Sequence, residues 1–484
     1  MCKIEERKLN LLMDLYQLTM SQGYFEGEYK NAMVTFDMFF RKVPDGGGYA
    51  ITAGLEQVIE YITTLSFNKE EIEFLDSLNL FNKQFLDYLA NFKFKGNVYA
   101  IKEGTPVFPN EPLITVEAPI IDAQLIETMV LLTMNHQSLI ATKANRIVRS
   151  AKGRGVMEFG SRRAQGYDGA LYGTRATFIG GATSTANVLA HKMFGVPSVG
   201  TMAHSWIQFH PSEFEAFKAY AMQYPDACTL LVDTYDVLHS GIPNAIRVAK
   251  EVLEPMGKRL KGIRLDSGDM AYLSKKCRKM LDNAGLTDCK IVVSNSLDEY
   301  TISSLLEQGA CIDIFGVGER MITAKSNPVF GGVYKLASVN VGDGKGYVPR
   351  IKISENSEKI TNPGFKSIWR LFDKETGKAI ADVITLKDEV IDESKPYVLF
   401  DPIYTYKRKT VTNFKAVQLQ IPVILNGKVV YESPTITEIQ DYCKEQVDTL
   451  WDEVKRLINP HTYYVDLSQD LWDLKQSLLM NNRK

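Results

Sequence analysis

The hydrophobic positions of the first 95 or so residues follow two different periods. Leucines between residues 11 and 18, and aliphatic residues between 55 and 62, recur every three or four positions, which is typical of amphipathic helices. Segment 34–41 is rich in β-branched and aromatic residues, and segment 97–118 is a string of short apolar runs separated by Gly and Pro. Both segments therefore predict strands. We expect an N-terminal α+β domain over residues 1–140.

A different rhythm starts near residue 155. Short apolar segments recur, and each is followed by a polar or Gly-rich turn and then by a helical stretch. This alternation predicts parallel βα units. The strands expected are 156–159, 176–179, 197–200, 229–232, 262–265, 290–293 and 312–315.

The polar residues directly after these strands favour a barrel over a doubly wound sheet. Barrel enzymes build their sites from the loops at the carboxyl ends of the strands. Seven strands leave the ring incomplete unless segment 333–336 supplies another. The fold class expected is therefore α/β, with an incomplete (β/α) barrel of about seven units over residues 141–340.

The remaining chain, 341–484, reads as a C-terminal extension with strands and a helix. Segment 341–364 is turn-rich, and further strands are expected at 367–372 and 379–385. Apolar residues at helical spacing predict an amphipathic helix over 437–459.

Composition narrows the functional classes. The 484 residues include 56 basic and 58 acidic side chains, a formal net charge of −2, so no global positive field attracts nucleic acid or an anionic membrane. Phosphate chemistry would have to come from a local site. The six cysteines form no C-x-x-C pair, and we expect reduced thiols. Without an apolar signal segment or a membrane-length apolar run, a cytoplasmic protein is expected.

The loops after the first three expected strands carry candidate anion-binding groups. Arg162 and Arg163 present planar donor groups at a strand–helix junction, although a solvated surface pair would look the same. Segment 180–187, which contains Ser184, has small residues and hydroxyls that suit either phosphate binding or a helix cap. His204 follows the third strand, where a general base, a nucleophile and a structural hydrogen-bonding histidine are all compatible with the sequence.

The later strand ends add a cation, carboxylates and a glycine turn. Arg264 alternates with Leu265, so the two side chains point to opposite sides. Asp266 and Asp269 suit either a helix cap or contacts with Mg²⁺ and ribose hydroxyls. The turn containing Gly316 and Gly318 lies where barrels usually bind phosphate. Together these groups fit a phosphorylated, hydroxyl-bearing substrate with a metal, and a sugar phosphate fits best.

At this point the motifs resemble those of the nicotinate phosphoribosyltransferase family. They occur in that family's order: DLYQLTM (14–20), EFGSRRAQG (158–166), GGATSTAN (180–187), GTMAHS (200–205), RLDSGD (264–269), VSNSLDE (293–299), FGVG (315–318) and GGVYKL (331–336). The tail 459–475 is also similar, so the resemblance covers nearly the whole chain. It implies an incomplete α/β barrel and a homodimer with shared active sites.

The resemblance also implies an activity: transfer of a phosphoribosyl group from phosphoribosyl pyrophosphate (PRPP) to nicotinate, giving nicotinate mononucleotide and pyrophosphate for NAD salvage. The family couples this transfer to ATP hydrolysis, a ligase-type classification, through a transient phosphohistidine. Mg²⁺ is the implied cofactor, with ATP and PRPP as co-substrates.

Matching the motifs residue by residue implies the following roles. His204 becomes the nucleophile, and Asp266 contacts ribose hydroxyls or the metal, with Asp269 as a second metal ligand. The nicotinate contacts implied are Tyr16, from the neighbouring subunit, with Phe159, Thr201 and Arg264. The PRPP contacts implied are Arg162, Arg163, Ser184, Ser267, Gly316, Gly318 and Glu319.

One position departs from the family's pattern. Glu319 stands where the family usually has a threonine, and a carboxylate facing phosphate would repel it. We expect the backbone amide of Glu319 to contact the phosphate and its side chain to point away from the phosphate.

Two alternatives remain. Relatives specific for nicotinamide carry an aspartate in the loop corresponding to 180–187, whereas this loop has no carboxylate. A catalytically silent metabolite-binding protein is disfavoured because His204, Arg264 and Asp266 are all present. Quinolinate phosphoribosyltransferases are disfavoured as well, because their chains are much shorter and lack the ATP-linked histidine that His204 matches.

Overall fold

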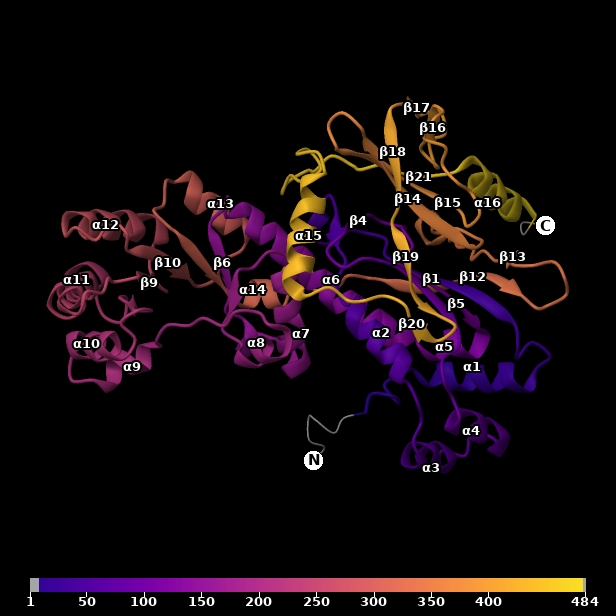
Figure 1. Ribbon diagram of the computed structural model, residues 1–484, viewed down its shortest axis with the longest axis horizontal. Helices are drawn as coiled ribbons and strands as arrows, with labels where there is room; N and C mark the ends of the chain where they lie inside the picture. Colours follow the sequence, from indigo (N-terminus) through magenta and orange to yellow (C-terminus); the bar gives the residue numbers. More distant parts are fainter. Residues whose placement is uncertain (1–7, 482–484) are drawn as a thin grey trace. The chain divides into compact units, whose positions relative to one another are not determined.

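The computed structural model describes residues 8–481, which form two compact units (Figure 1). One unit combines residues 8–139 with 329–481, and the other comprises residues 140–328. Segments 1–140 and 341–484, which the sequence analysis treats as separate domains, therefore contribute to the same unit. Within the described residues, no helix is long and apolar enough to span a bilayer.

The first unit is built on an antiparallel sheet of seven strands. Its order is β13-β12-β1-β5-β3-β19-β20, so three strands from the N-terminal part of the chain form the centre and strands from the C-terminal part flank them on both sides. The strands are β1 (Met33–Phe39), β3 (Asn97–Ile101), β5 (Ile114–Pro119), β12 (Val333–Asn340), β13 (Val348–Pro349), β19 (Gln420–Leu425) and β20 (Lys428–Val429). The strands predicted at 34–41 and within 97–118 are confirmed.

A second sheet of this unit has the order β18-β14-β15-β21 and carries the strands predicted at 367–372 and 379–385. Its members are β14 (Lys366–Asp373), β15 (Ala379–Leu386), β18 (Phe414–Gln418) and β21 (Val465–Leu467); two-stranded sheets pair β2 (Ala50–Ile51) with β4 (Pro106–Val107) and β16 (Tyr397–Phe400) with β17 (Arg408–Val411). The helix expected over 437–459 is α15 (Ile436–Asp448), which begins at a Thr435 capping box and ends earlier than predicted.

The helices of the first unit include the two that the leucine and aliphatic patterns predict near residues 11–18 and 55–62, at α1 and α2. Their bounds are α1 (Leu15–Glu26), α2 (Leu55–Thr64), α3 (Lys69–Ser77), α4 (Lys83–Ala90), α5 (Ile120–Leu125) and α16 (Gln469–Asn481). The long helix α6 (Glu127–Ser150) runs from the first unit into the second.

The second unit is a curled, entirely parallel sheet that forms an incomplete barrel, as expected. Its order is β7-β6-β11-β10-β9-β8, with β6 (Gly155–Glu158), β7 (Ser184–Thr185), β8 (Thr229–Leu231), β9 (Gly262–Leu265), β10 (Lys290–Ser294) and β11 (Ile314–Val317). Most residues of β8 to β11 are buried, and aliphatic residues predominate among the buried ones, which is typical of a parallel sheet covered by helices.

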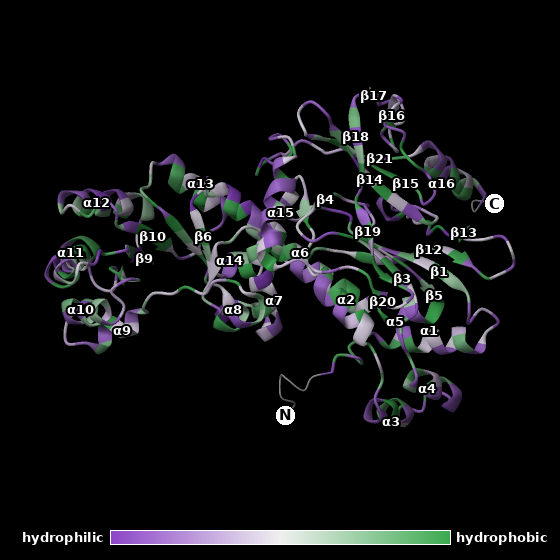
Figure 2. Cartoon of the chain, viewed as in Figure 1, coloured by the Kyte–Doolittle hydropathy of each residue, from purple (hydrophilic) through white to green (hydrophobic). Residues whose placement is uncertain are grey.

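Helices connect and cover these parallel strands. They are α7 (Gly166–Ile179), α8 (Val188–Phe194), α9 (His204–Phe209), α10 (Glu213–Gln223), α11 (Ile242–Val248), α12 (Met270–Asn283), α13 (Glu299–Glu307) and α14 (Glu319–Ile322). Helix α12 mixes hydrophilic and hydrophobic residues along its turns (Figure 2), and its buried positions include Met270, Ala271, Cys277 and Leu281. This amphipathic pattern lets one face pack on the sheet.

Two strand predictions for the barrel are wrong. Segment 176–179 is the buried end of helix α7, and the second strand is instead β7, at residues 184–185. Segment 197–200 makes only an isolated parallel bridge, Thr185 to Ser198. Segment 333–336 lies in β12, which pairs with β1 in the first unit and adds no barrel strand. The parallel sheet therefore has six strands rather than seven.

Candidate active site

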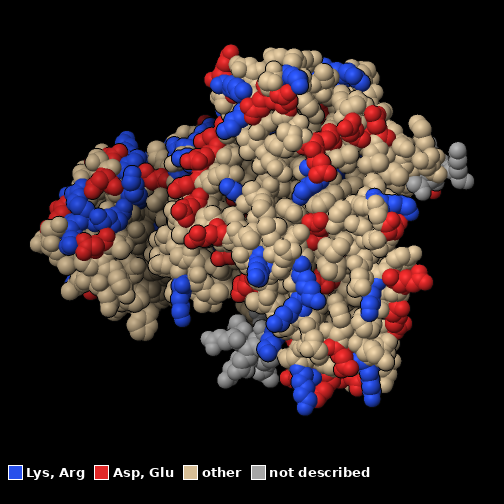
Figure 3. All heavy atoms as spheres, turned by 45° about the vertical axis from the view of Figure 1, so that its right-hand side comes forward, with Lys and Arg blue, Asp and Glu red and all other residues tan. Residues whose placement is uncertain are grey.

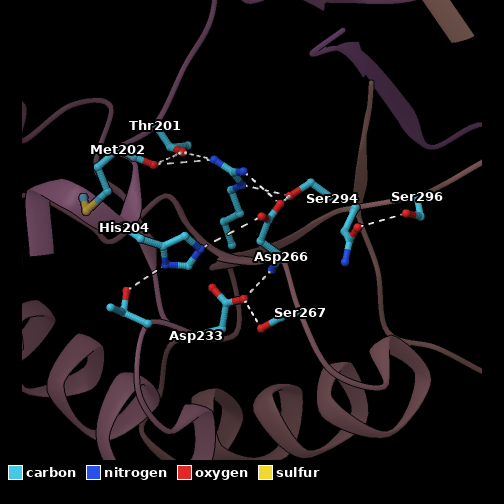
Figure 4. Close-up of polar contacts among 11 residues, drawn as sticks. Thr201, Met202, His204, Asp233, Asp266, Ser267, Ser294 and Ser296 are labelled. Atoms are coloured by element: carbon cyan, nitrogen blue, oxygen red, sulfur yellow. Dashed lines mark hydrogen bonds and ion pairs between the residues drawn. The ribbon is translucent and has the colours of Figure 1, made fainter. Parts of the chain in front are cut away.

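Arg264 is the centre of a polar cluster at the carboxyl ends of the parallel strands. Its side chain lies opposite to that of Leu265, which is fully buried. The guanidinium donates to Thr201 Oγ1 (3.0 Å), Ser294 Oγ (2.9 Å) and Asp266 Oδ1 (3.0 Å); Figure 4 labels these three acceptors. Three loops far apart in sequence are thereby held around one cation.

Two carboxylates lie beside this arginine. Asp266 Oδ1 also accepts a hydrogen bond from Ser294, so that oxygen is fully engaged. Asp233 Oδ2 accepts from the Asp266 backbone N–H (2.9 Å) and from Ser267 Oγ (2.6 Å). Asp233 Oδ1 is buried and has no hydrogen-bond partner within residues 8–481. A buried carboxylate oxygen without a donor is costly, so it is a natural position for a ligand donor or a cation.

The charge state of Asp266 follows from these contacts. Burial acts to raise its pKa, but the Ser294 hydrogen bond, followed by the charge and hydrogen bond of Arg264, outweighs burial, so the pKa lies below its ordinary value. The carboxylate is therefore ionised at neutral pH.

His204 is the first residue of α9 and faces the same cluster (Figure 4). Its Nδ1 lies 3.0 Å from Thr234 Oγ1, and its Nε2 lies 4.0 Å from Asp266 Oδ2. Nε2 makes no hydrogen bond to any residue that the structure describes. The histidine side chain is 39% exposed. The imidazole is thus fixed through one nitrogen, and the other is accessible beside a carboxylate.

The loop after β6 forms the neighbouring wall. The Phe159 ring centre lies 5.8 Å from Arg264 Cζ, and the Phe159 N–H donates to Val317 O (2.7 Å). A Cβ atom at Gly316 would lie 2.7 Å from the Phe159 ring, so glycine is required for this ring to occupy its position. Arg162 and Arg163 follow in a short 3-10 turn.

The buried carboxylate of Glu158 holds the start of this loop in place through hydrogen bonds. It accepts hydrogen bonds from Thr185 Oγ1 (2.6 Å), Thr174 Oγ1 (3.2 Å) and the Gly160 N–H. Burial raises the pKa of Glu158, while these hydrogen bonds oppose the rise. Because its donors come from β7, α7 and the Phe159 loop, Glu158 fixes where the loop begins.

The glycine turn after β11 contains Gly318 and is followed directly by Glu319. The Glu319 carboxylate forms an ion pair with Lys325 Nζ (2.7 Å), and it lies 3.8 Å from Arg163 Nη1. The hydrogen bond from Lys325, with its charge, holds the pKa of Glu319 below the ordinary value. The side chain therefore faces two cations.

Some predicted residues lie outside the Arg264 cluster. Asp269 caps α12 by accepting from the Tyr272 N–H (2.7 Å), in agreement with the helix-cap alternative. Ser184 is buried within strand β7 rather than in a loop. Tyr16 belongs to α1 of the first unit, where its side chain is 43% exposed.

The sequence analysis assigns no role to Asp233, Thr234 and Ser294, which the structure places in contact with Asp266 or His204. They follow β8 or end β10, and these strands flank β9. The sequence signal that could have identified them as site residues was their position directly after a predicted strand. In the described part of the chain, no group of three or more His, Cys, Asp or Glu side chains could hold a metal ion.

A curled parallel sheet with an arginine, two carboxylates and a histidine at its strand ends defines an α/β-barrel enzyme. Models of the nicotinate phosphoribosyltransferase family match residues 155–387, and models of that family's N-terminal and C-terminal domains match residues 11–135 and 365–475. The chain belongs to the nicotinate phosphoribosyltransferase family, as its motifs predicted.

Individual relatives are similar to this chain over nearly its full length. The chain is 46% identical to nicotinate phosphoribosyltransferase of Bacillus subtilis, covering 97% of this chain and 95% of the relative. It is 36% identical to that of Dictyostelium discoideum, covering 98% and 88%. The crystal structure of human nicotinic acid phosphoribosyltransferase superimposes with a TM-score of 0.84 at 30% identity, covering 97% of this chain and 100% of that one. A nicotinate-nucleotide pyrophosphorylase structure from Pyrococcus furiosus gives 0.69 at 26% identity, covering 93% and 97%.

Proposed function

We propose that this protein transfers the phosphoribosyl group of PRPP to nicotinate, giving nicotinate mononucleotide and pyrophosphate in NAD biosynthesis. The observation that carries the proposal is the Arg264 cluster, in which Thr201, Asp266 and Ser294 all contact one guanidinium at the strand ends. Full-length similarity to nicotinate phosphoribosyltransferases supports the choice of acceptor. The alternative acceptor, nicotinamide, has no comparable support.

The acceptor would lie between the Phe159 ring and Arg264. A pyridine ring stacks on an aromatic side chain, and its carboxylate pairs with a guanidinium that retains one unused N–H donor, on Nη2. Displacement of pyrophosphate then forms the bond between the pyridine nitrogen and the ribose C1 while the C1–oxygen bond breaks. Developing positive charge on the ribose is stabilised by Asp266, which is ionised. Arg162 and Arg163 would contact the phosphates.

Mg²⁺ fits this donor set as a cofactor shared with the substrate. Mg²⁺ is usually held by one or two protein carboxylates together with substrate phosphates and water. Asp233, whose Oδ1 is buried without a partner, and Asp266 are the residues that would hold it. When bound, the ion would neutralise pyrophosphate charge.

We further propose that ATP hydrolysis is coupled to the transfer through His204. A neutral imidazole with its proton on Nδ1 would donate to Thr234 Oγ1 and leave the Nε2 lone pair free to attack the γ-phosphorus. The Nε2–phosphorus bond forms as the bond to ADP breaks. The product carries a positive ring that Asp266 Oδ2, 4.0 Å from Nε2, would stabilise. Water later releases the phosphate.

The decisive test uses purified protein with PRPP, Mg²⁺ and either nicotinate or nicotinamide, with and without ATP. We expect mononucleotide from nicotinate, stimulated by ATP. A preference for nicotinamide, or no turnover with either acceptor, would overturn the proposal.

His204→Ala tests the coupling separately. The variant should lose ATP stimulation and should no longer retain label from γ-labelled ATP. His191→Ala is the matched control, because His191 is exposed and its imidazole hydrogen-bonds only with Ser198 in the described structure. Label retained on the His204→Ala protein would refute the assignment.

We also propose a cytoplasmic homodimer with shared active sites, in which Tyr16 of one subunit stacks on the pyridine ring bound by another. The exposure of Tyr16 supports its availability to a partner. Light scattering should give a dimer mass, and Tyr16→Ala should raise the KM for nicotinate. A monomer mass together with an unchanged KM would contradict this arrangement.

A further inference from the structure

The first unit contains a cavity of about 390 Å³ that the proposed function does not use. It is formed by the end of β1, segment 358–366, residues 402–403 and helix α16. All of its lining residues belong to this one unit. The volume is sufficient for a small organic molecule.

Lys475, on α16, lines this cavity and makes one hydrogen bond to the protein through its side chain. Its ammonium donates to Asn362 Oδ1 (2.8 Å), and no carboxylate within the described ranges forms an ion pair with it. An ammonium carries three donors, so two of them remain for a ligand. Lys366, in contrast, already pairs with Asp37 (2.7 Å) and donates to Gly364 O (2.6 Å).

The charges around the cavity leave an excess of positive charge. Burial, followed by the nearby charge of Lys366, lowers the pKa of Lys475 to about 8. Both effects oppose the ammonium, and the charge of an anion placed beside it would counteract them. The charged lining residues are four cations and two carboxylates: Arg41, Lys42, Lys366, Lys475, Asp37 and Glu358.

Most of the uncharged wall is apolar, and part of it is fixed in position. Trp472 Nε1 donates to Pro402 O (3.0 Å), which holds the indole against the 402–403 segment. Ile403 has 79% of its surface exposed, whereas Leu467 and Ile384, which also line the cavity, are buried. Such a surface favours a ligand with an apolar body.

We propose that this cavity binds a small organic anion, with its carboxylate or phosphate on Lys475 and its apolar body against Trp472 and Ile403. The site goes beyond the proposed transferase activity, because none of its residues belongs to the strand-end cluster around Arg264. Figure 3 shows basic and acidic side chains interspersed over the visible surface, so the proposal depends on this local geometry rather than on a broad basic patch.

The test follows the reactivity of Lys475 by acetylation at several pH values and peptide mass spectrometry. In the free protein, Lys475 should react with a midpoint near its pKa of about 8. Bound benzoate or phenyl phosphate should raise that pKa; a rise of about one unit would slow acetylation roughly tenfold at lower pH. Comparison of these two probes distinguishes carboxylate from phosphate preference, and benzamide, which is neutral, should not protect. No protection by either aryl anion would overturn the proposal.

A rim variant tests the apolar part. Ile403→Trp places an indole at the cavity entrance and should abolish protection by benzoate while Lys475 of the free variant still reacts. Ile458→Trp is the matched control, because Ile458 is similarly exposed (73%) but lies outside the cavity. Equal protection of both variants, or protection by inorganic phosphate as strong as that by benzoate, would refute an apolar binding surface.

Discussion

The hydrogen bond between His204 and Thr234 gives a quantitative test of the proposed phosphoryl transfer. Thr234→Val keeps the side-chain shape and removes the hydroxyl that lies 3.0 Å from Nδ1. A neutral hydrogen bond contributes about 1 kcal/mol net, and a tenfold rate change corresponds to about 1.4 kcal/mol. Protein phosphorylation by ATP should therefore slow about fivefold, because the imidazole is no longer held in one orientation and tautomer.

The assay measures single-turnover transfer of labelled γ-phosphate to the protein, alongside PRPP-dependent mononucleotide formation without ATP. Only the first rate should fall in Thr234→Val, since the Arg264 contacts are unaltered. Thr234→Ser, which retains the hydroxyl, should phosphorylate at close to the normal rate. Normal phosphorylation of the valine variant, or an equal loss in the serine variant, would refute the reasoning.

Three further changes test other parts of the molecule. Glu319→Thr should lower the KM for PRPP about two- to fivefold, because it frees Arg163 from a weak, partly exposed ion pair; an unchanged KM would contradict this role. Arg370→Met leaves Asp382 buried without its cation and should lower the free energy of unfolding by about 3–5 kcal/mol, measured by urea denaturation. Burial, followed by the charge of Asp401, raises the pKa of Asp466 from 3.8 to about 7, so the folded state binds the extra proton and stability falls as pH rises across that interval. Asp466→Asn should reduce the slope of stability against pH, and an unchanged slope would disprove the assignment.

The barrel was predictable where strands were short, buried and followed by polar residues. Strands β8 to β11 meet these conditions, and the sequence located all four. The strand prediction for segment 176–179 was wrong because a short buried apolar run has no hydrophobic period that distinguishes a strand from the end of a buried helix. Residues 173–179 are all buried in α7, so helix and strand present the same hydrophobic signal there.

The sheets of the first unit were not predictable, because their pairing is non-local. Strand β12 has the composition of another barrel strand, yet it pairs with β1, about 300 positions earlier in the chain. Strand β19 similarly pairs with β3. Local composition predicts that these segments are extended, but it contains no information on which distant edge completes their hydrogen bonds.

The site could be predicted residue by residue only where a single motif contained both the functional side chain and the neighbouring residue that sets its orientation. Alternation along β9 placed Arg264 opposite to Leu265, and the structure confirms that orientation. The roles of Asp233 and Ser294 depended on the order β10-β9-β8, which brings loops from both flanking strands against Asp266. Strand order is a property of the assembled sheet, so these contacts became visible only in three dimensions.

In both Asp266 and Asp233, one carboxylate oxygen has a structural role and the other is available for chemistry. Asp266 commits Oδ1 to Arg264 and Ser294, and its Oδ2 faces His204. Asp233 commits Oδ2 to the backbone and hydroxyl of the Asp266–Ser267 turn, and its Oδ1 is left buried without a partner. Because one oxygen of each side chain is immobilised, the other is held in a fixed direction before any substrate arrives. Preorganised charge of this kind stabilises a charge-separating transition state without reorganisation at the moment of reaction.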